Sequence, residues 1–468
     1  MMSPQPARLG LSRSCSTAPV RTVIYEACTS FPSSLPATLR SRRSSHLSLG
    51  GYNRGMKNTE KKPIFFDIPA DAVLPDYDGY SIAAIPSLIS TAFGAPDPRA
   101  AALHAAVEHV IPDGIEKVVL LVLDGVGYDH LGRILAAHPE LALHRLIDSG
   151  AMLPITSVFP PTTVSALTTY STGLTPQEHG MVGYRLYLRE TSTITNMIRM
   201  SVLGSGKGDS ALDEGIDPKT FLGVSTLYSR LRRAGVESHI LIGKHISGSG
   251  LSSIIYDGKE KVHGTVTLSD MLVSARRILM RTQVKTFLSL YWGAPDGIAH
   301  TYGPWTDEFT AELRAIDAAI ERELIGQVEN TLLIISADHG FVPMRESDYH
   351  DLTAIPELEH ALLLPPLGEP RASYLYLREG TRKRVMAAFE EHLEDGLVVI
   401  DSDTALASGL FGVGPVREAV RDRIGDLIIV STGPAAILHP YKDAIKLKGM
   451  HGGLTRDEML IPLIVAKL

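Results

Sequence analysis

The sequence has very little cysteine. Its 468 residues include two, Cys15 and Cys28, and both lie near the N-terminus. The rest of the chain therefore has no thiolate that could hold zinc and no thiol that could form a disulfide. Any metal ion bound there must be held by His, Asp or Glu side chains, and disulfides cannot hold the core together.

Long apolar runs and an excess of positive charge are also missing. No run approaches the roughly 18 apolar residues of a transmembrane helix, and the strongest runs, 118–123 and 332–335, have the length of strands. The net charge of −7 argues against a nucleic-acid-binding surface, which is normally basic. It does not exclude a small phosphorylated substrate, because a metal site supplies local positive charge.

Residues 1–55 differ in composition from the rest. They are rich in Ser and Arg, their one acidic residue is Glu26, and they contain no apolar segment typical of a secretory signal. Two interpretations remain: an organellar transit peptide, or a start assigned too early with Met56 as the true initiator, which we favour. On either interpretation we expect this tail to be disordered and to carry no chemistry. We expect the protein to be cytoplasmic, and the sequence leaves its oligomeric state open.

From residue 60 onward, strand-like and helix-like segments alternate. The apolar run within 116–124 is bounded by turn residues, which is typical of a parallel strand covered on both faces. The expected strands are 116–124, 151–159, 238–242, 286–291, 331–337 and 460–466. The expected helices are 163–171, 225–234, 270–282 and 307–324. This rhythm predicts an α/β fold with a doubly wound, mostly parallel sheet and helices on both faces.

One block interrupts the alternation. Residues 341–440 contain Pro-rich turns, an alternating strand at 372–377 and a helix at 381–393. We interpret the chain as an α/β core at 56–340, an inserted small subdomain at 341–440, and a return to the core at 441–468. We expect the inserted subdomain to cover the site and to set its specificity.

Candidate metal ligands fall where expected strands end, which is where open α/β sheets gather their ligands. Asp124 ends one strand and Asp338-His339 ends another. A short loop after the strand 286–291 contains Asp296 and His300, and a Gly-rich turn contains His451. These donors suit Zn²⁺, Mn²⁺ or Mg²⁺. A single Asp after a strand is more often a helix N-cap. The prediction of a metal site therefore depends on the joint occurrence of these residues.

A hydroxyl nucleophile is expected near the start of the helix 163–171. Thr162, Thr163 and Ser165 would all lie at its N-terminus, where the helix dipole and free N–H groups favour an anion. A hydroxyl bound to a metal ion there loses its proton more readily and becomes a competent nucleophile. The alternative is simple N-capping by a threonine.

The order of these motifs resembles the type I phosphodiesterase/nucleotide pyrophosphatase family of the alkaline phosphatase superfamily, in its bacterial form. The resemblance covers roughly 115–345 and 445–468. The segments that carry it are 122–125, 159–163, 172–180, 295–300 with 303–304, 336–340 and 451–453. Six separate motifs in the family's order make a far more specific signal than any one of them.

The resemblance implies a role for each matching residue. One metal ion would be held by Asp296, His300 and His451, and the other by Asp124, Asp338, His339 and the Oγ atom of Thr163. Family members usually carry two zinc ions, and manganese suits the same ligands. Thr163 would attack phosphorus and form a phospho-threonine that water then hydrolyses. The backbone N–H of Val164 would bind an oxygen of the phosphoryl group.

Two positions depart from the eukaryotic members of the family. Val164 stands where those enzymes have an aromatic residue, and Tyr184 stands where they have an Asn that contacts a phosphate oxygen. The hydroxyl of Tyr184 or the guanidinium of Arg185 is the candidate to replace that contact. The resemblance therefore predicts the catalytic machinery and leaves the substrate open.

Three functions follow in order of preference. The first is a two-metal hydrolase of phosphodiester or phosphoanhydride bonds acting on a small phosphate ester. The second is a phosphomonoesterase or phosphonate hydrolase on the same fold, which needs a further cation such as Arg185 for the extra negative charge. The third is a non-catalytic binding protein, which predicts missing ligands; all six side-chain ligands and the threonine are present.

Overall fold

The computed structural model describes residues 68–393, 395–441 and 447–468. Both interpretations of residues 1–55 concern a part of the chain outside these ranges. Within the ranges, none of the helices combines the length and the apolar character that crossing a membrane requires.

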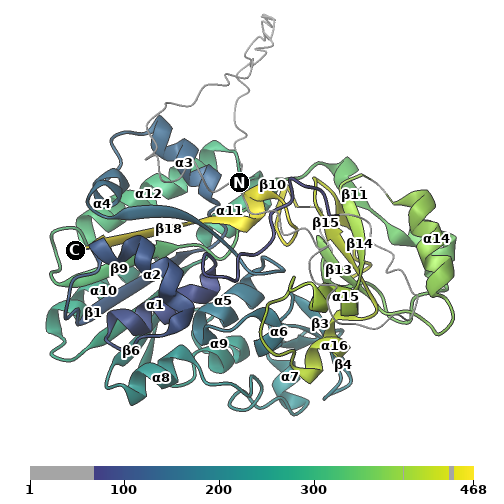
Figure 1. The fold of residues 1–468 in the computed structure, drawn as a ribbon, viewed down its shortest axis with the longest axis horizontal. Coiled ribbons are helices and arrows are strands. Elements are labelled where there is room, and N and C mark those ends of the chain that lie inside the picture. The colour runs from purple at the N-terminus through teal and green to yellow at the C-terminus, as the bar shows by residue number, and fades with distance from the viewer. Residues whose placement is uncertain (1–67, 394, 442–446) are drawn as a thin grey trace, which may run out of the picture. The chain divides into compact units, whose positions relative to one another are not determined.

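A seven-stranded mixed sheet forms the centre of the fold (Figure 1). Its order is β2 (Ala151–Thr156), β18 (Leu460–Lys467), β9 (Thr331–Ser336), β1 (Lys117–Leu123), β8 (Thr286–Trp292), β6 (Glu237–Gly243) and β7 (Lys261–Thr265). From β9 to β7 every pair of neighbours is parallel, whereas β18 runs antiparallel to both β9 and β2. The predicted doubly wound, mostly parallel sheet is confirmed.

The central strand β1 ends level with its two neighbours, and this brings the residues that follow the three strands together. All of its residues after Lys117 are buried, as its continuous apolar sequence predicts. Its register pairs Leu123 with Trp292 of β8 and Val122 with Ser336 of β9. Because the three strands are parallel and end at the same level, the residues that follow them are brought together at one edge.

Helices cover both faces of the sheet. Figure 1 shows α3, α4 and α12 on one face and α1, α5 and α8 on the other. The helices of this part of the fold are α1 (Ile85–Ala92), α2 (Ala101–Val107), α3 (Tyr128–Ala137), α4 (Leu143–Ser149), α5 (Thr163–Thr172), α6 (Pro176–His179), α8 (Leu227–Arg233), α9 (Gly250–Ile255), α10 (Leu268–Arg281), α11 (Ala294–Tyr302), α12 (Asp307–Glu323) and α17 (Arg456–Met459), whereas α7 (Ser210–Asp213) contacts the second sheet described next. Amphipathic helices such as α10 bury one stripe against the sheet, with Leu272 and Leu279 fully covered.

A second seven-stranded sheet draws its strands from two distant parts of the chain. Its order is β14 (Leu397–Asp401), β15 (Leu427–Ser431), β13 (Ala372–Leu375), β12 (Leu367–Glu369), β3 (Arg185–Leu188), β4 (Thr193–Asn196) and β5 (Ser201–Val202). Helices α13 (Pro356–Glu359), α14 (Arg382–His392), α15 (Ser402–Ala407) and α16 (Glu418–Ile424) accompany it. The expected boundary at residue 340 stays a prediction, and β3–β5 show that residues before it also build the second sheet.

Two short ladders complete the description. One pairs β10 (Val342–Pro343) with β17 (Gly449–Met450), and the other pairs β11 (Tyr349–His350) with β16 (Ala436–Ile437). The first ladder places the segment after β9 beside the turn that contains His451.

Two expected elements differ in the structure. The strand expected at 151–159 ends at Thr156, and beyond it the N–H of Ser157 donates to the carbonyl of Met459 in α17 and the N–H of Phe159 to the hydroxyl of Tyr77, outside the sheet. The loop expected at Asp296 and His300 is the helix α11, in which Pro295 occupies the first turn, where a missing N–H costs nothing.

Candidate metal centre and nucleophile

Asp124 follows β1 directly and begins a tight turn. Its N–H donates to the carbonyl of Trp292 at the end of β8, which fixes the two strand ends together. The next residue, Gly125, has φ of +77°, and a Cβ atom there would lie 2.4 Å from the ring of Phe341. The turn therefore requires glycine, and it leaves the Asp124 carboxylate buried, where it accepts a hydrogen bond from the hydroxyl of Tyr291.

Asp338 and His339 follow β9 and are completely buried. Asp338 Oδ1 accepts from the N–H groups of Gly125 and His339, at 3.0 Å each, and so joins the ends of β1 and β9. His339 Nε2 lies 3.3 Å from Asp124 Oδ1 and 3.5 Å from both Asp338 Oδ2 and the Oγ1 atom of Thr163.

Asp296 and His300 lie one turn apart on α11, so both side chains point from the same face of the helix. Asp296 Oδ1 is 3.3 Å from His300 Nε2 and 3.8 Å from His451 Nε2. The other ring nitrogen of each histidine faces a carbonyl, Gly449 for His300 and Pro161 for His451. These contacts orient the Nε2 atoms toward Asp296, as in histidines that bind metals.

The ligand atoms form two converging groups among the described residues. One contains Asp296, His300 and His451, and the other contains Asp124, Asp296 and His339, with the atoms of each group within 4.8 Å of one another. The first group is the set implied by the resemblance. The second has Asp296 in place of Asp338, whose Oδ2 atom lies beside His339. The structure thus brings all six predicted ligands to one place, and their role in metal binding stays a prediction.

The electrostatics of this cluster favour a bound cation. Burial and the negative charges of Asp338 and Asp296 raise the pKa of Asp124 well above its ordinary value. Burial acts to raise the pKa of Asp296 as well, but the neighbouring His300 and His451 outweigh it and lower that pKa to about 2. Asp124 Oδ1, Asp296 Oδ1 and Asp338 Oδ2 are buried without a hydrogen-bond partner among the described residues. Buried anionic oxygens of this kind are stabilised by a cation.

Thr163 is the first residue of α5, and the fold holds this helix rigidly. All ten residues of α5 are buried, and the hydroxyl of Tyr170 donates to the carbonyl of Ala337, next to Asp338. The helix ends at Gly173, whose φ of +68° suits glycine. Val164 is the second helical residue, so its N–H has no acceptor within the helix and faces the N-terminal end, where an anion is favoured.

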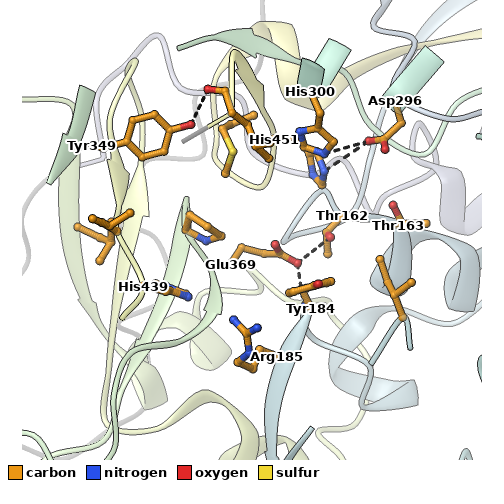
Figure 2. A pocket seen from close by; sticks show the side chains of 16 residues that line it. Thr162, Thr163, Tyr184, Arg185, Asp296, His300, Tyr349, Glu369, His439 and His451 are labelled. Carbon is orange, nitrogen blue, oxygen red and sulfur yellow. Dashed lines mark hydrogen bonds and ion pairs between the residues drawn. The ribbon is translucent and has the colours of Figure 1, made fainter. Parts of the chain in front are cut away.

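A cavity of about 310 Å³ opens beside these residues. Figure 2 shows Thr163, Asp296, His300 and His451 on one side of it, with Glu369 near its centre. The remaining lining residues are Thr162, Tyr184, Arg185, Ile198, Tyr349, Pro370, Ile437, Leu438, His439, Leu447 and Met450. The cavity therefore has one wall from the ends of the first sheet and one from the second sheet and its connections.

Tyr184 and Arg185, the predicted substrate contacts, both line this cavity. The hydroxyl of Tyr184 accepts a hydrogen bond from Asn196 Nδ2 at 2.6 Å. The guanidinium of Arg185 lies over the ring of Tyr441, 3.9 Å from its centroid. Both residues are in the position that the prediction requires, and contact with a substrate stays a prediction.

Sequence reasoning missed Glu369 and His439, which lie on the second-sheet side of the cavity. Glu369 Oε1 accepts from the Thr162 hydroxyl at 2.7 Å, and His439 Nε2 lies 2.8 Å from Ser373 Oγ. Both are almost completely buried. Glu369 stands in a Gly-Glu-Pro turn that reads as a surface loop, so no local pattern distinguishes it from an exposed acid.

The fold and the site define a class. The doubly wound α/β sheet, with a cluster of Asp and His side chains beyond the ends of its strands, is an alkaline-phosphatase-like fold. The model of the type I phosphodiesterase/nucleotide pyrophosphatase family matches residues 118–454. The chain belongs to this family, and the match indicates a hydrolase of phosphate esters.

Solved structures support the fold. Murine ectonucleotide pyrophosphatase/phosphodiesterase 5 is 19% identical, with a TM-score of 0.59 over 75% of this chain and 88% of that one. Phosphonoacetate hydrolase from Sinorhizobium meliloti 1021, in complex with phosphonoformate, is 21% identical, with a TM-score of 0.56 over 75% of this chain and 90% of that one. A search of curated proteins gives no match to this sequence.

Proposed function

We propose that this protein is a two-metal hydrolase of phosphodiester or phosphoanhydride bonds in small phosphate esters, with Thr163 as its nucleophile. The observation that carries the proposal is the position of the Thr163 hydroxyl. It stands at the N-terminus of a buried helix, 3.5 Å from His339 Nε2, in the wall of a cavity that also contains Asp296, His300 and His451. The family match supports the same reaction class.

The ligand set fits two divalent cations, and we propose zinc, with manganese as the alternative. Asp296, His300 and His451 would hold one ion, and Asp124, Asp338 and His339 the other. Three carboxylates offset three of the four positive charges of two divalent ions, the three imidazoles are neutral donors, and the buried carboxylate oxygens without partners among the described residues fit this role. Bound there, the ions supply Lewis-acid stabilisation of the negative charge on the attacking and leaving oxygens.

The chain's own groups perform the chemistry as follows. The Thr163 hydroxyl gives its proton to solvent water, which also protonates the leaving group, and its Oγ forms a bond to phosphorus while the bond from phosphorus to the leaving oxygen breaks. The leaving group departs with that electron pair and takes up a proton. The N–H of Val164 donates to a non-bridging oxygen of the phosphoryl group. Water then cleaves the phospho-threonine, and the Thr163 hydroxyl is restored.

A phosphonate hydrolase is the second candidate. The similarity to phosphonoacetate hydrolase draws attention to it, although at 21% identity this similarity shows only the fold. The specific observation in its favour is Arg185 in the cavity wall, since a guanidinium there is suited to a substrate carboxylate.

The test is a paired hydrolysis assay on the full-length, metal-loaded chain. It compares bis-p-nitrophenyl phosphate, a diester, with p-nitrophenyl phosphate, a monoester, for the wild type and Thr163→Ala. We expect diester preference in the wild type and a loss of at least about 1000-fold in the variant, because the nucleophile is removed. A monoester preference that Thr163→Ala also abolishes would keep the site and change the substrate class.

The matched control is Ser165→Ala, two residues further along α5. Ser165 Oγ is buried and has no hydrogen-bond partner among the described residues, so its removal should change activity little. Activity that survives Thr163→Ala but not Ser165→Ala would show that the nucleophile is misassigned.

A further inference from the structure

Glu369 is an acidic side chain near the centre of the cavity for which the proposed chemistry has no role. It ends β12 of the second sheet and is 5% exposed. Its Oε1 atom accepts two hydrogen bonds, from the Thr162 hydroxyl at 2.7 Å and from the Tyr184 N–H at 2.8 Å. Figure 2 shows the carboxylate between Thr162 and Tyr184, below the side chain of His451.

The hydrogen bond between Thr162 and Glu369 affects the N-terminus of α5, the helix that starts with the proposed nucleophile Thr163. Thr162 is the N-cap residue of α5, yet its side chain makes no capping hydrogen bond to the first turn. The hydroxyl donates to Glu369 instead. The N–H groups of the first turn thus remain without a side-chain cap and stay available to a phosphoryl oxygen, directly beside a carboxylate.

The charge of Glu369 interacts electrostatically with a predicted metal ligand, His300. Its carboxylate is among the groups that raise the pKa of His300, and His300 is in turn among those that lower the pKa of Glu369. Burial raises the pKa of Glu369 to about 7, while the hydrogen bonds from Thr162 and Tyr184 oppose the rise. A charge on a buried side chain acts more strongly on a neighbouring ion than it would in bulk water.

We propose that Glu369 is a specificity-determining residue that disfavours substrates whose reacting phosphoryl group carries two negative charges. Such a group, as in a phosphomonoester, enters beside Thr162 and Thr163 and is repelled by the carboxylate. A diester or an internal anhydride phosphorus carries one negative charge and is repelled less. This inference rests on the proposed function and narrows its substrate class to singly charged phosphoryl centres.

The geometry of Glu369 allows its charge to be tested apart from its contacts. Both hydrogen bonds end on the same oxygen, so Glu369→Gln can keep them through its carbonyl oxygen while it loses the charge. At pH 9 the wild-type side chain is ionised. We expect the diester-to-monoester ratio of kcat/KM to fall by about tenfold or more in Glu369→Gln, chiefly through a lower KM for the monoester.

Two further variants separate charge from position. Glu369→Ala also removes the charge, so the ratio should fall in the same direction even if overall activity drops. Thr162→Val removes the donor to Oε1 and keeps the charge, so it should lower activity on both substrates and leave the ratio unchanged. Thermal unfolding of each variant confirms that it is folded.

The outcomes distinguish the two proposals. A wild type that hydrolyses neither substrate overturns both. A wild type that hydrolyses the diester through Thr163, combined with a ratio within about twofold of wild type in both charge-removing variants, overturns the role of Glu369 alone. A ratio that changes in Thr162→Val as much as in Glu369→Gln also overturns it, because position would then explain the effect.

Discussion

The two walls of the cavity are built in different ways. The wall at the first sheet includes Thr163, the first residue of α5, and Asp296 and His300, which lie one turn apart on α11. The wall at the second sheet is assembled from Arg185, Glu369 and His439, of which the first and the last are 254 residues apart in the sequence. The first wall contains residues of the proposed chemistry, and we expect the second to contact the rest of the substrate.

The difference shows where chemistry and selectivity are encoded. Parallel strands that end together place their next residues side by side, so short motifs suffice to build the first wall. The second wall depends on β3 pairing with β12, and so on one segment meeting another far away in sequence. We expect changes in the first wall to abolish activity and changes in the second to alter stability or selectivity.

The largest effect is expected at Asp296, which belongs to both converging groups. Asp296→Asn should lower kcat/KM by at least about 1000-fold and reduce the bound metal, because a neutral amide is a poorer ligand. Metal content by mass spectrometry and steady-state kinetics check this. Asp129→Asn is the matched control, since Asp129 forms an ion pair with Arg456 outside the cavity. Unchanged metal content in Asp296→Asn would contradict the assignment.

A stability effect is expected where the two regions are joined. Arg371 and Glu458 are fully buried and form a paired contact at 2.6 and 2.8 Å, and Glu458 also accepts from the N–H of Gly453, near His451. Arg371→Met leaves a buried carboxylate without its cation and should cost about 3–5 kcal/mol of unfolding free energy. Urea unfolding measures it.

An exposed ion pair provides the contrast. Arg145→Ala removes the partner of Glu321, with both side chains about half exposed, and should cost at most about 1 kcal/mol. Equal effects of the two substitutions would show that the buried pair does not hold the regions together.

The next effect is a pH dependence of the unfolding free energy of the metal-free protein. The folded pKa of Glu369, about 7, lies above its ordinary value of 4.5, so the folded state binds this proton more tightly than the unfolded state. The contribution of Glu369 to stability is therefore full below pH 4.5 and falls as the pH rises to 7. The loss amounts to about 3 kcal/mol. Urea unfolding at several pH values, compared with Glu369→Gln, isolates it; parallel curves for the two proteins would contradict it.

The smallest effect is expected at the hydroxyl of Tyr184, which accepts from Asn196. Tyr184→Phe removes one hydrogen-bonding group at the second wall and should raise KM by less than about tenfold, while turnover at saturating substrate stays nearly unchanged. Steady-state kinetics on the diester check it. If kcat of the variant instead fell strongly, this hydroxyl would take part in the chemical step, as we expect of residues in the first wall.

The sequence alone predicted much of what surrounds the first wall. The apolar run before Asp124 predicted a buried central strand, and the order of six motifs predicted the family and the fold. It placed Asp296 and His300 in a short loop after the strand 286–291. Proline in a first helical turn is tolerated, and the structure has the helix α11 there.

What only the tertiary structure decided is the second wall and its relation to the first. Strands and the residues that come directly after them are specified locally, by apolar runs and turn residues that lie next to one another in the chain. The burial of Glu369 depends on β12 lying beside β3 and on Thr162 lying opposite, and neither contact leaves a local pattern. An acid in a Gly-Glu-Pro turn becomes a buried, hydrogen-bonded carboxylate only when distant segments surround it. The sequence therefore determined the predicted chemistry of this protein, and long-range packing decided which groups of the second wall line the cavity.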